Sequence, residues 1–279
     1  MCRMVAIISK KNAGAECLRK YCLASEKALF NQSRHDGKRT QRDGWGLAFY
    51  GPKGLSVFKS EKPVFREKEL LGKKLAEAGG SRIFISHIRD ASNPGNLPRE
   101  KLIARKNSQP FSAGEVSFAH NGTLFIADEI YSNLGRYKKF VGGVNDSEVL
   151  FWTFMKTLDA YGDMQTALEM TRDEIKTVWI SVAGEFKTKG IKEPYRGLNV
   201  FVSDGKALHA LCDYGLKKGK SSLMTPGWEW GRFAVRREKD SAVISSEPLD
   251  GGNWLKTEPN SVIKISGTGE LSLKTRKLQ

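Results

Sequence analysis

Cys2 directly follows the initiator methionine, and its chemistry depends on whether Met1 is removed. Methionine is usually trimmed when a small residue follows, and the chain would then begin with a residue that carries both a thiol and a free α-amine. The reference pKa of an α-amine is about 7.7–8.0, so this amine could take the thiol proton near neutral pH. A nucleophile beside such a base suits covalent catalysis and needs no histidine. The alternative is that Cys2 is a small apolar residue leading into a strand.

Three other short motifs contain groups that could hold or polarise a substrate. In SHIRDAS, Arg89 follows an apolar run and could grip a carboxylate with two hydrogen bonds, or it could form a surface ion pair with Asp90. In FAHNGT, the Asn121 amide and the Gly122 backbone N–H could form a two-donor oxyanion hole, although Asn-Gly is first of all a turn signal. In NDSE, Asp146 could receive a substrate ammonium or serve only to begin a helix.

Two further segments have weaker chemical content. The glycines of DGWGL, on either side of Trp45, permit a close backbone approach near a ligand, but they also suit a tight turn. The segment SSEPL, which begins at Ser245, predicts no more than a structured turn at a strand end. His87 and His120 lie inside the motifs above, and both are expected to be structural because the N-terminal amine would already supply a base.

The composition excludes several classes of protein. The chain has 279 residues, of which 39% are hydrophobic and 10% aromatic, so a real core is expected. No apolar run approaches the ~20 residues that span a bilayer, and residues 4–8 are too short an apolar stretch for a signal peptide. The four cysteines form no CxxC pair, which predicts reduced thiols and a cytoplasmic protein. Without a P-loop, a dinucleotide fingerprint or metal-ligand spacing, no cofactor and no metal are expected.

The net charge of +15, from 46 basic and 31 acidic residues, could indicate binding to nucleic acid. The basic residues are nevertheless spread along the chain, and no aromatic–basic interleaving typical of RNA-binding proteins is present. The sequence therefore favours an ordinary solvated basic surface, with no nucleic-acid or membrane partner.

The apolar spacing predicts an α+β fold in which sheets pack together and helices cover them, in a single domain over residues 1–279. Helices are expected at residues 15–30, 67–78, 146–160 and 164–176. Strands are expected at residues 3–9, 45–50, 55–59, 82–89, 116–124, 178–183, 198–203, 207–213, 233–235, 242–245, 262–266 and 271–275. Loops are expected at 31–43 and 92–108, a turn at 121–122, and a variable segment at 215–232.

Taken together and in order, the motifs resemble the class II glutamine amidotransferases, whose nucleophile is the N-terminal residue. The resemblance rests on the opening Met-Cys-Arg, DGWGLAFY, SHIRDAS, QPF, FAHNGTL, NDSE and SSEPL, and it spans residues 1 to about 265. It is greatest to the stand-alone branch, whose members lack an attached synthase domain. The resemblance implies a four-layer αββα sandwich of the N-terminal nucleophile hydrolase type.

The resemblance also implies a role for each motif residue. Cys2 would be the nucleophile and its α-amine the general base. Asn121 and the N–H of Gly122 would form the oxyanion hole. Arg89 would hold the α-carboxylate of glutamine.

On the same basis, Ser92 would assist Arg89, and Asp146 would bind the α-ammonium. The chain departs from the family pattern at two positions. Gln109 stands where relatives commonly have His before Pro-Phe, and Asn145 stands where they commonly have Thr before Asp-Ser-Glu. These departures bear on the support of the glutamine pocket and not on the reaction class.

The expected function is hydrolysis of the γ-amide of glutamine through a γ-glutamyl thioester on Cys2. One alternative is hydrolysis of another γ-glutamyl amide, such as a glutathione-derived peptide, because the same head-group clamp would serve. Another is a catalytically silent basic binding protein, against which the intact Cys2, Asn121 and Gly122 argue. The ammonia could pass to a partner synthase or to a small acceptor, or it could be released.

Overall fold

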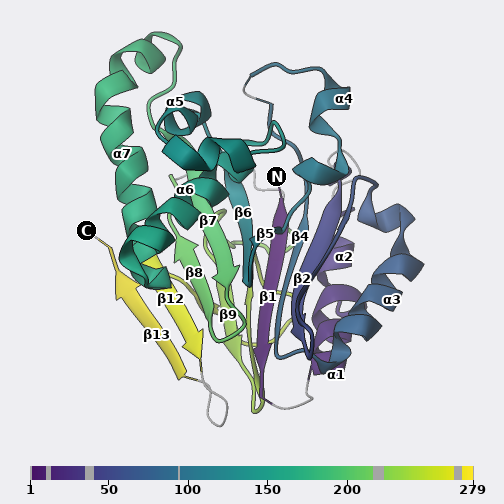
Figure 1. Cartoon of the computed structure of the whole chain (residues 1–279). Helices are drawn as coiled ribbons and strands as arrows, with labels where there is room; N and C mark the ends of the chain where they lie inside the picture. The colour runs from purple at the N-terminus through teal and green to yellow at the C-terminus, as the bar shows by residue number, and fades with distance from the viewer. Residues whose placement is uncertain are drawn as a thin grey trace.

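Two antiparallel β-sheets pack face to face, and helices cover their outer faces (Figure 1). The computed structural model describes residues 2–10, 14–34, 41–93, 95–215, 223–266 and 272–278. The order across the seven-stranded sheet is β11 (Leu255–Lys256), β9 (Ala234–Arg237), β10 (Ser241–Ser245), β1 (Arg3–Ser9), β4 (Ile83–Ile88), β2 (Trp45–Gly51) and β3 (Gly54–Ser60). The order across the six-stranded sheet is β13 (Ser272–Lys277), β12 (Ser261–Ser266), β8 (Leu208–Cys212), β7 (Tyr195–Ser203), β6 (Val116–Leu124) and β5 (Phe111–Ala113).

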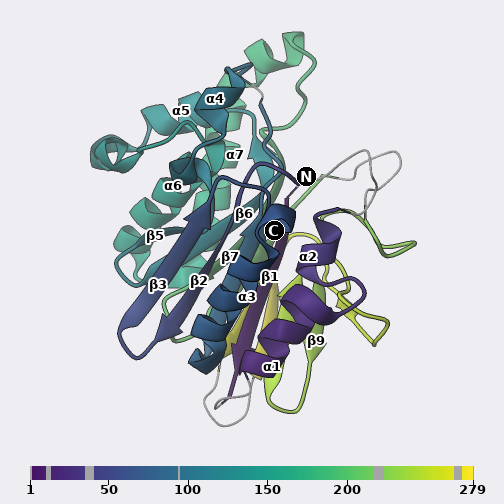
Figure 2. The ribbon, with the colours of Figure 1, turned by 90° about the vertical axis from the view of Figure 1, so that its right-hand side faces the viewer.

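The helices divide between the two outer faces, as Figures 1 and 2 show. The seven-stranded sheet is covered by α1 (Gly14–Arg19), α2 (Leu29–Gln32) and α3 (Lys68–Glu77). The six-stranded sheet is covered by α5 (Ala127–Ser132), α6 (Asp146–Tyr161) and α7 (Met164–Thr188). A short helix, α4 (Arg99–Leu102), lies in the connection between β4 and β5. The predicted four-layer αββα sandwich is confirmed.

Successive side chains along β1 alternate between the two faces of the seven-stranded sheet, and both faces are buried. Along β1, Met4, Ala6 and Ile8 point between the two sheets, whereas Val5 and Ile7 pack under the helices of the seven-stranded sheet. All five side chains are at most 1% exposed. A strand with two buried faces reads as a continuous apolar run, and residues 4–8 form such a run.

The antiparallel pairing gathers three chain segments at one end of the sandwich. Arg3 at the start of β1 pairs with Ile88 at the end of β4, so the residues just before β1 and just after β4 are neighbours. Both strands pack across the sandwich against β6. In Figure 1 the N-terminus lies at the upper end of the sheets, with α4 and α5 beyond it.

The structure corrects four sequence predictions. Asn121 and Gly122 do not turn the chain: they continue β6, where they pair with Asn199 and Leu198 of β7. The expected strand 178–183 belongs to α7, which ends at Thr188. The apolar residues there repeat every three or four positions, and this helical spacing outweighs the strand propensity of their β-branched side chains; they are Ile175, Val178, Trp179, Val182 and Phe186.

The expected helix 15–30 is also wrong as one element. It is divided into α1, a π-helical turn at Lys20–Ala24, and α2, because Ser25 adopts an extended conformation and ends the first part. The expected loop 92–108 contains α4 and a 3-10 turn at Arg105–Asn107. The other expected elements are present with ends shifted by a few residues. Residues 35–40 and Pro94 of the two expected loops, residues 216–222 of the expected variable segment, and Leu271 lie outside the described residues.

Candidate active site

Cys2 lies between the two sheets at the end where β1 begins. It has the same strand parity as Met4 and Ala6, which places its side chain on the face that meets the other sheet, and it is only 9% exposed. Its sulfur contacts the backbone just after β4, where the Asp90 N–H points at Sγ across 3.4 Å and the Asp90 carbonyl lies 3.6 Å away. The thiol is therefore held against the segment that carries Arg89.

Burial raises the pKa of the Cys2 thiol, an effect that Arg89 and Arg3 partly oppose and Asp146 reinforces. The resting group is accordingly a thiol near neutral pH, and a base must remove its proton before it can attack.

The described histidines cannot readily supply that base. Burial, with help from Arg89, lowers the pKa of His87 to about 3, and burial lowers the pKa of His209 to about 4. His120 is committed to two hydrogen bonds: Nε2 donates to the Gly197 carbonyl at 2.9 Å, which leaves Nδ1 to accept from the Ser147 hydroxyl at 2.9 Å. Its pKa is lowered by burial, so it stays neutral.

Arg89 is fixed at the end of β4 by the DGWGL segment. Its backbone N–H donates to the Gly44 carbonyl at 2.8 Å, and its carbonyl accepts from the Asp43 N–H at 3.2 Å. The guanidinium donates through Nη1 to the Leu102 carbonyl at 2.7 Å. Asp43 in turn accepts from the Ala91 N–H at 2.8 Å, which ties the segment after Arg89 into the same loop. The alternative of a surface ion pair with Asp90 does not fit Arg89, because the side chain is only 4% exposed.

Asp146 is the first residue of α6, and its placement follows from the helix cap. The Asn145 side chain accepts from the Ser147 N–H at 3.0 Å, as a good N-cap should, and donates to the Asn107 carbonyl at 2.8 Å. One oxygen of Asp146 accepts from the Leu124 N–H at 2.8 Å, which joins the start of α6 to the end of β6. The other oxygen has only a 3.5 Å contact with the Ser147 hydroxyl.

A cavity of about 450 Å³ brings Arg89, Ser92 and Asp146 together. Its volume suits a small molecule. The cavity wall continues from these residues along the β6–α5 connection, the end of α7 and the segment after β4; the remaining lining residues are Asn93, Gly95, Leu97, Leu102, Leu124, Phe125, Ala127, Asp128, Glu129, Val144, Asn145, Phe186, Lys189 and Ile191. A cation and an anion in one cavity can hold a zwitterion by both of its charges.

Asn121 and Gly122 lie on β6, opposite the start of β1. Ala119 belongs to the core between the sheets, so Asn121, two residues on, faces the same interior as Cys2; it is 6% exposed. Its strand position is set by Gln109, whose side chain accepts from the His120 N–H at 2.6 Å and donates to the His120 carbonyl at 3.2 Å. Gln109 therefore anchors β6 directly before Asn121.

Gly122 has no room for a side chain. A Cβ atom there would lie 1.8 Å from the Gly197 carbonyl oxygen and 2.5 Å from His120 Nε2. Since the first of these is backbone, Gly122→Ala is expected to push β6 and β7 apart and to destabilise the protein by about 1–3 kcal/mol or more. Urea unfolding measures this, with Gly184→Ala on α7 as the matched control, because nothing lies within 4 Å of a Cβ there. An unchanged unfolding midpoint in Gly122→Ala would contradict the close approach.

The SSEPL segment contains a residue that the sequence reasoning missed. Glu247 is fully buried and forms an ion pair with Arg3, with 3.3 Å between Oε1 and Nε. A glutamate in an otherwise apolar and small-residue stretch, together with an arginine next to Cys2, was the available signal.

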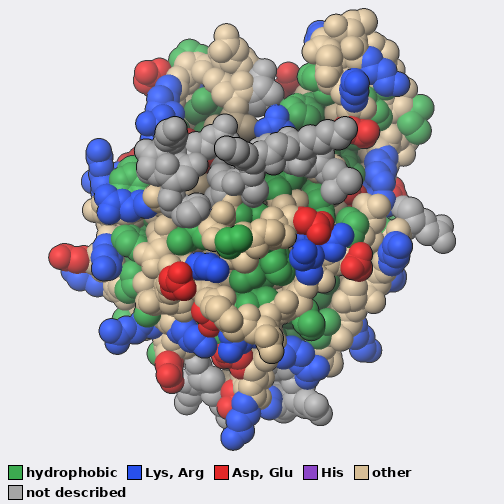
Figure 3. Space-filling view, turned by 180° about the vertical axis from the view of Figure 1, so that it is seen from behind, with side chains coloured by type: hydrophobic (Ala, Val, Ile, Leu, Met, Phe, Trp, Pro, Cys, Tyr) green, Lys and Arg blue, Asp and Glu red, His purple; other side chains and the backbone are tan. Residues whose placement is uncertain are grey.

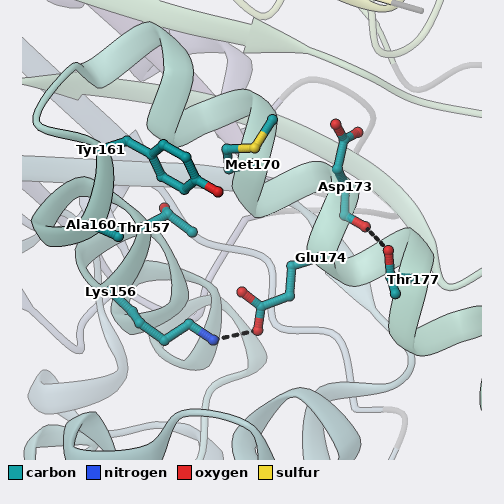
Figure 4. Close-up of a pocket in the computed structure, with 8 residues that line it drawn as sticks. All are labelled: Lys156, Thr157, Ala160, Tyr161, Met170, Asp173, Glu174 and Thr177. Carbon is teal, nitrogen blue, oxygen red and sulfur yellow. Dashed lines mark hydrogen bonds and ion pairs between the residues drawn. The ribbon is translucent and has the colours of Figure 1, made fainter.

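A second cavity, of about 460 Å³, lies between α6 and α7 (Figure 4). Its most prominent polar contact is the ion pair of Lys156 with Glu174, at 2.5 Å. Tyr161 and Met170 contribute apolar surface. None of the residues singled out by the motifs lines this cavity, and it contains no nucleophile beside a base.

The described part of the chain contains no helix long and apolar enough to cross a membrane. It also contains no group of three or more His, Cys, Asp or Glu side chains placed to hold a metal ion. Lys and Arg side chains are dispersed over the face seen in Figure 3 and form no continuous stripe there.

Comparison with known proteins finds one matching family model and relatives that share its description. The model of the class-II glutamine amidotransferases matches residues 1–222. The probable glutamine amidotransferase DUG3 of Saccharomyces cerevisiae is 27% identical over 286 residues, which cover 85% of this chain and 75% of the relative. The putative glutamine amidotransferase YafJ of Escherichia coli is 27% identical over 245 residues, which cover 81% of this chain and 86% of the relative.

Solved structures share the fold. A glutamine aminotransferase class-II domain protein from Silicibacter pomeroyi superposes with a TM-score of 0.62 at 18% identity, covering 99% of both chains. The glutamine phosphoribosylpyrophosphate amidotransferase of Bacillus subtilis gives a TM-score of 0.60 at 17% identity, covering 99% of this chain and 49% of that one. At these identities the likeness establishes the architecture.

Proposed function

Because this chain belongs to the class-II glutamine amidotransferases, we propose that it hydrolyses the γ-amide of glutamine through a thioester on Cys2. The observation that carries the proposal is the cavity that Arg89, Ser92 and Asp146 line together, with the Cys2 sulfur held against the backbone of Asp90, the residue that follows Arg89. Family membership supports an enzyme that acts on glutamine, and the arrangement of these groups supports the steps below.

In the first step, the α-carboxylate of glutamine pairs with Arg89 and the α-ammonium pairs with Asp146. Arg89 is 4% exposed, so this ion pair would form largely out of water, where a charged hydrogen bond is strong. Asp146 has one oxygen engaged by the Leu124 N–H, which orients the other toward a ligand. Ser92 lines the same cavity and adds a hydroxyl.

In the second step, the α-amine of a trimmed Cys2 takes the thiol proton and the sulfur attacks the γ-carbonyl carbon. The carbonyl oxygen becomes an oxyanion, which the Asn121 amide and the Gly122 N–H stabilise. The amine then returns the proton to the leaving nitrogen, and ammonia departs. Water attacks the resulting thioester with the same amine as base, which releases glutamate and restores the thiol.

The proposal is tested by turnover of the purified protein on glutamine, asparagine and γ-glutamyl peptides, with the N-terminal mass measured on the same sample. Release of ammonia from glutamine is the expected result. A clear preference for a γ-glutamyl peptide would retain the head-group clamp and change the leaving group. No turnover of any γ-glutamyl compound by a protein with a trimmed N-terminus would overturn the proposal.

The clamp makes a separate prediction about binding. Arg89→Ala is expected to lower kcat/KM for glutamine by about 10- to 100-fold, because a lost charged hydrogen bond costs roughly 1.5–3 kcal/mol. Glutamine with an acylated amine or an amidated α-carboxyl should be refused by the unaltered protein. Arg136→Ala is the matched control, because Arg136 is 77% exposed, pairs with Asp159 and does not line the cavity. Equal turnover of the blocked substrates would show that the clamp is wrong.

A further inference from the structure

A buried ion pair lies one residue away from the proposed nucleophile. The Arg3 and Glu247 side chains are 1% and 0% exposed and approach within 3.3 Å. Arg3 belongs to β1, and Glu247 follows the end of the neighbouring strand β10. Taking two charges out of water is costly, and a well-packed apolar pair is often as stable or more stable. Stability alone therefore does not account for charges at this place.

The contacts of this pair converge on the main chain of residues 2–4. Arg3 Nη1 donates to the Cys2 carbonyl at 3.1 Å. Next to Glu247, the Ser246 hydroxyl accepts from the Met4 N–H at 2.9 Å, and the Ser246 N–H donates to the Met4 carbonyl at 3.0 Å. The segment after β10 thus holds the start of β1 at successive points.

Glu247 is itself held in place by two further hydrogen bonds. Its Oε2 atom accepts from the Thr225 N–H at 2.9 Å, and its carbonyl accepts from the Ser245 hydroxyl at 2.6 Å. The carboxylate consequently has a defined position before it meets Arg3. Arg3 contacts both this carboxylate and the Cys2 carbonyl, so the position of Glu247 determines where the Cys2 main chain is held.

We propose that Glu247 is a positioning residue which, through Arg3, fixes the main chain of Cys2 for attack. Holding the main chain of Cys2 matters because the thiol and the proposed base, the α-amine, are both attached through the same Cα atom. A residue at the end of the chain would have no preceding strand to hold it, so the carbonyl is the natural point of attachment. This inference rests on the proposed function, since it assigns the pair a part in the reaction of Cys2.

The first test is Glu247→Gln, which retains an acceptor for Thr225 and removes the negative charge. We expect kcat for glutamine to fall by about 10- to 100-fold, because small misplacements of reacting groups cost rates of this size. KM should change less than about twofold, since Arg89 and Asp146 are untouched. Glu238→Gln is the matched control: Glu238 directly follows β9 of the same sheet and pairs with Lys20 and Arg236, and its loss should leave kcat unchanged.

Because Glu247→Gln leaves Arg3 buried without its counter-ion, the variant could fail to fold. The double variant Arg3→Met with Glu247→Met avoids this, since an apolar pair of similar volume is expected to keep the fold. A structural role alone predicts that this double variant regains normal kcat. The positioning role predicts that kcat stays low, while Glu247→Asp recovers part of it.

The closing measurement does not depend on glutamine. The rate at which iodoacetamide alkylates Cys2 is followed by mass spectrometry in the unaltered protein and in the variants, with N-terminal trimming verified in each. If the unaltered protein does not turn over glutamine, the proposed function fails, but an altered alkylation rate in the double variant would still support positioning. Unchanged alkylation and unchanged kcat in a folded double variant would overturn the inference.

Discussion

Replacing Cys2 with alanine is expected to reduce turnover of glutamine on the order of 10⁵- to 10⁶-fold, to background, because the nucleophile is lost. The fold should survive, since Cys2 precedes β1 and the described polar contacts of its side chain are two long sulfur contacts with the Asp90 backbone. Turnover and thermal unfolding of the same preparation separate the two effects. Normal activity in this variant would end the proposed mechanism.

A thiol-directed glutamine analogue should label Cys2 and spare the other three cysteines. Burial raises the pKa of Cys17 to about 11 and that of Cys212 to about 11, and it raises the pKa of Cys22 further. Among the described contacts, Cys17 bonds to Ser241 and Cys212 bonds to Gly231 and Thr257, and none joins these three thiols to the segment that carries Arg89. Peptide mapping after labelling identifies the site, and Cys17→Ala serves as the control that should label normally.

The state of the N-terminus provides the companion test of the base. With Met1 retained, the Cys2 nitrogen is an amide and cannot accept a proton. With Met1 removed, kcat/KM should rise with pH through the range about 7.7–8.0, because the amine must be neutral to act as a base. A preparation that mass spectrometry shows to retain Met1, yet is as active as the trimmed form, would contradict the role of the amine.

The architecture could be predicted because strand and helix spacing is local information. The run at residues 4–8 and the amphipathic pattern of α6 each specify an element without reference to the rest of the chain. The errors arose where the sequence carried two signals. Val178, Trp179 and Val182 suit a strand by type and a helix by spacing, and packing against the six-stranded sheet decides for the helix.

Asn121-Gly122 is a second case in which a local sequence signal was overridden by long-range pairing, this time in the candidate site. As a dipeptide it favours a turn, yet the pairing of β6 with β7 holds it in a strand, and the absence of a Cβ at Gly122 permits the close approach to Gly197. The sequence identified the residue types that could do chemistry. The signal for Glu247 was easy to miss, because the partner of that carboxylate is Arg3, more than two hundred positions away. That the whole chain forms one domain stays a prediction.

Asn121→Ala is expected to lower kcat by roughly 10²- to 10³-fold with little change in KM, because a donor to a developing oxyanion acts in the transition state and not on the bound substrate. The side chain faces the interior between the sheets, on the same side as Cys2, and the strand that carries it is held by Gln109 and Gly197. Asn121→Asp should be similarly impaired, since it is nearly isosteric but presents an acceptor where a donor is needed.

The matched control for this prediction is Asn199→Ala. Asn199 pairs with Asn121 across β6 and β7, but its amide donates to the Gly231 carbonyl, so its loss should reduce stability and leave kcat close to normal. Steady-state kinetics of both variants, with unfolding midpoints measured in parallel, decide the matter. If the Asn121 variant lost affinity for glutamine instead of rate, the side chain would belong to the binding of the ground state, and the oxyanion would need its second donor from elsewhere on the segment that begins at Gly122.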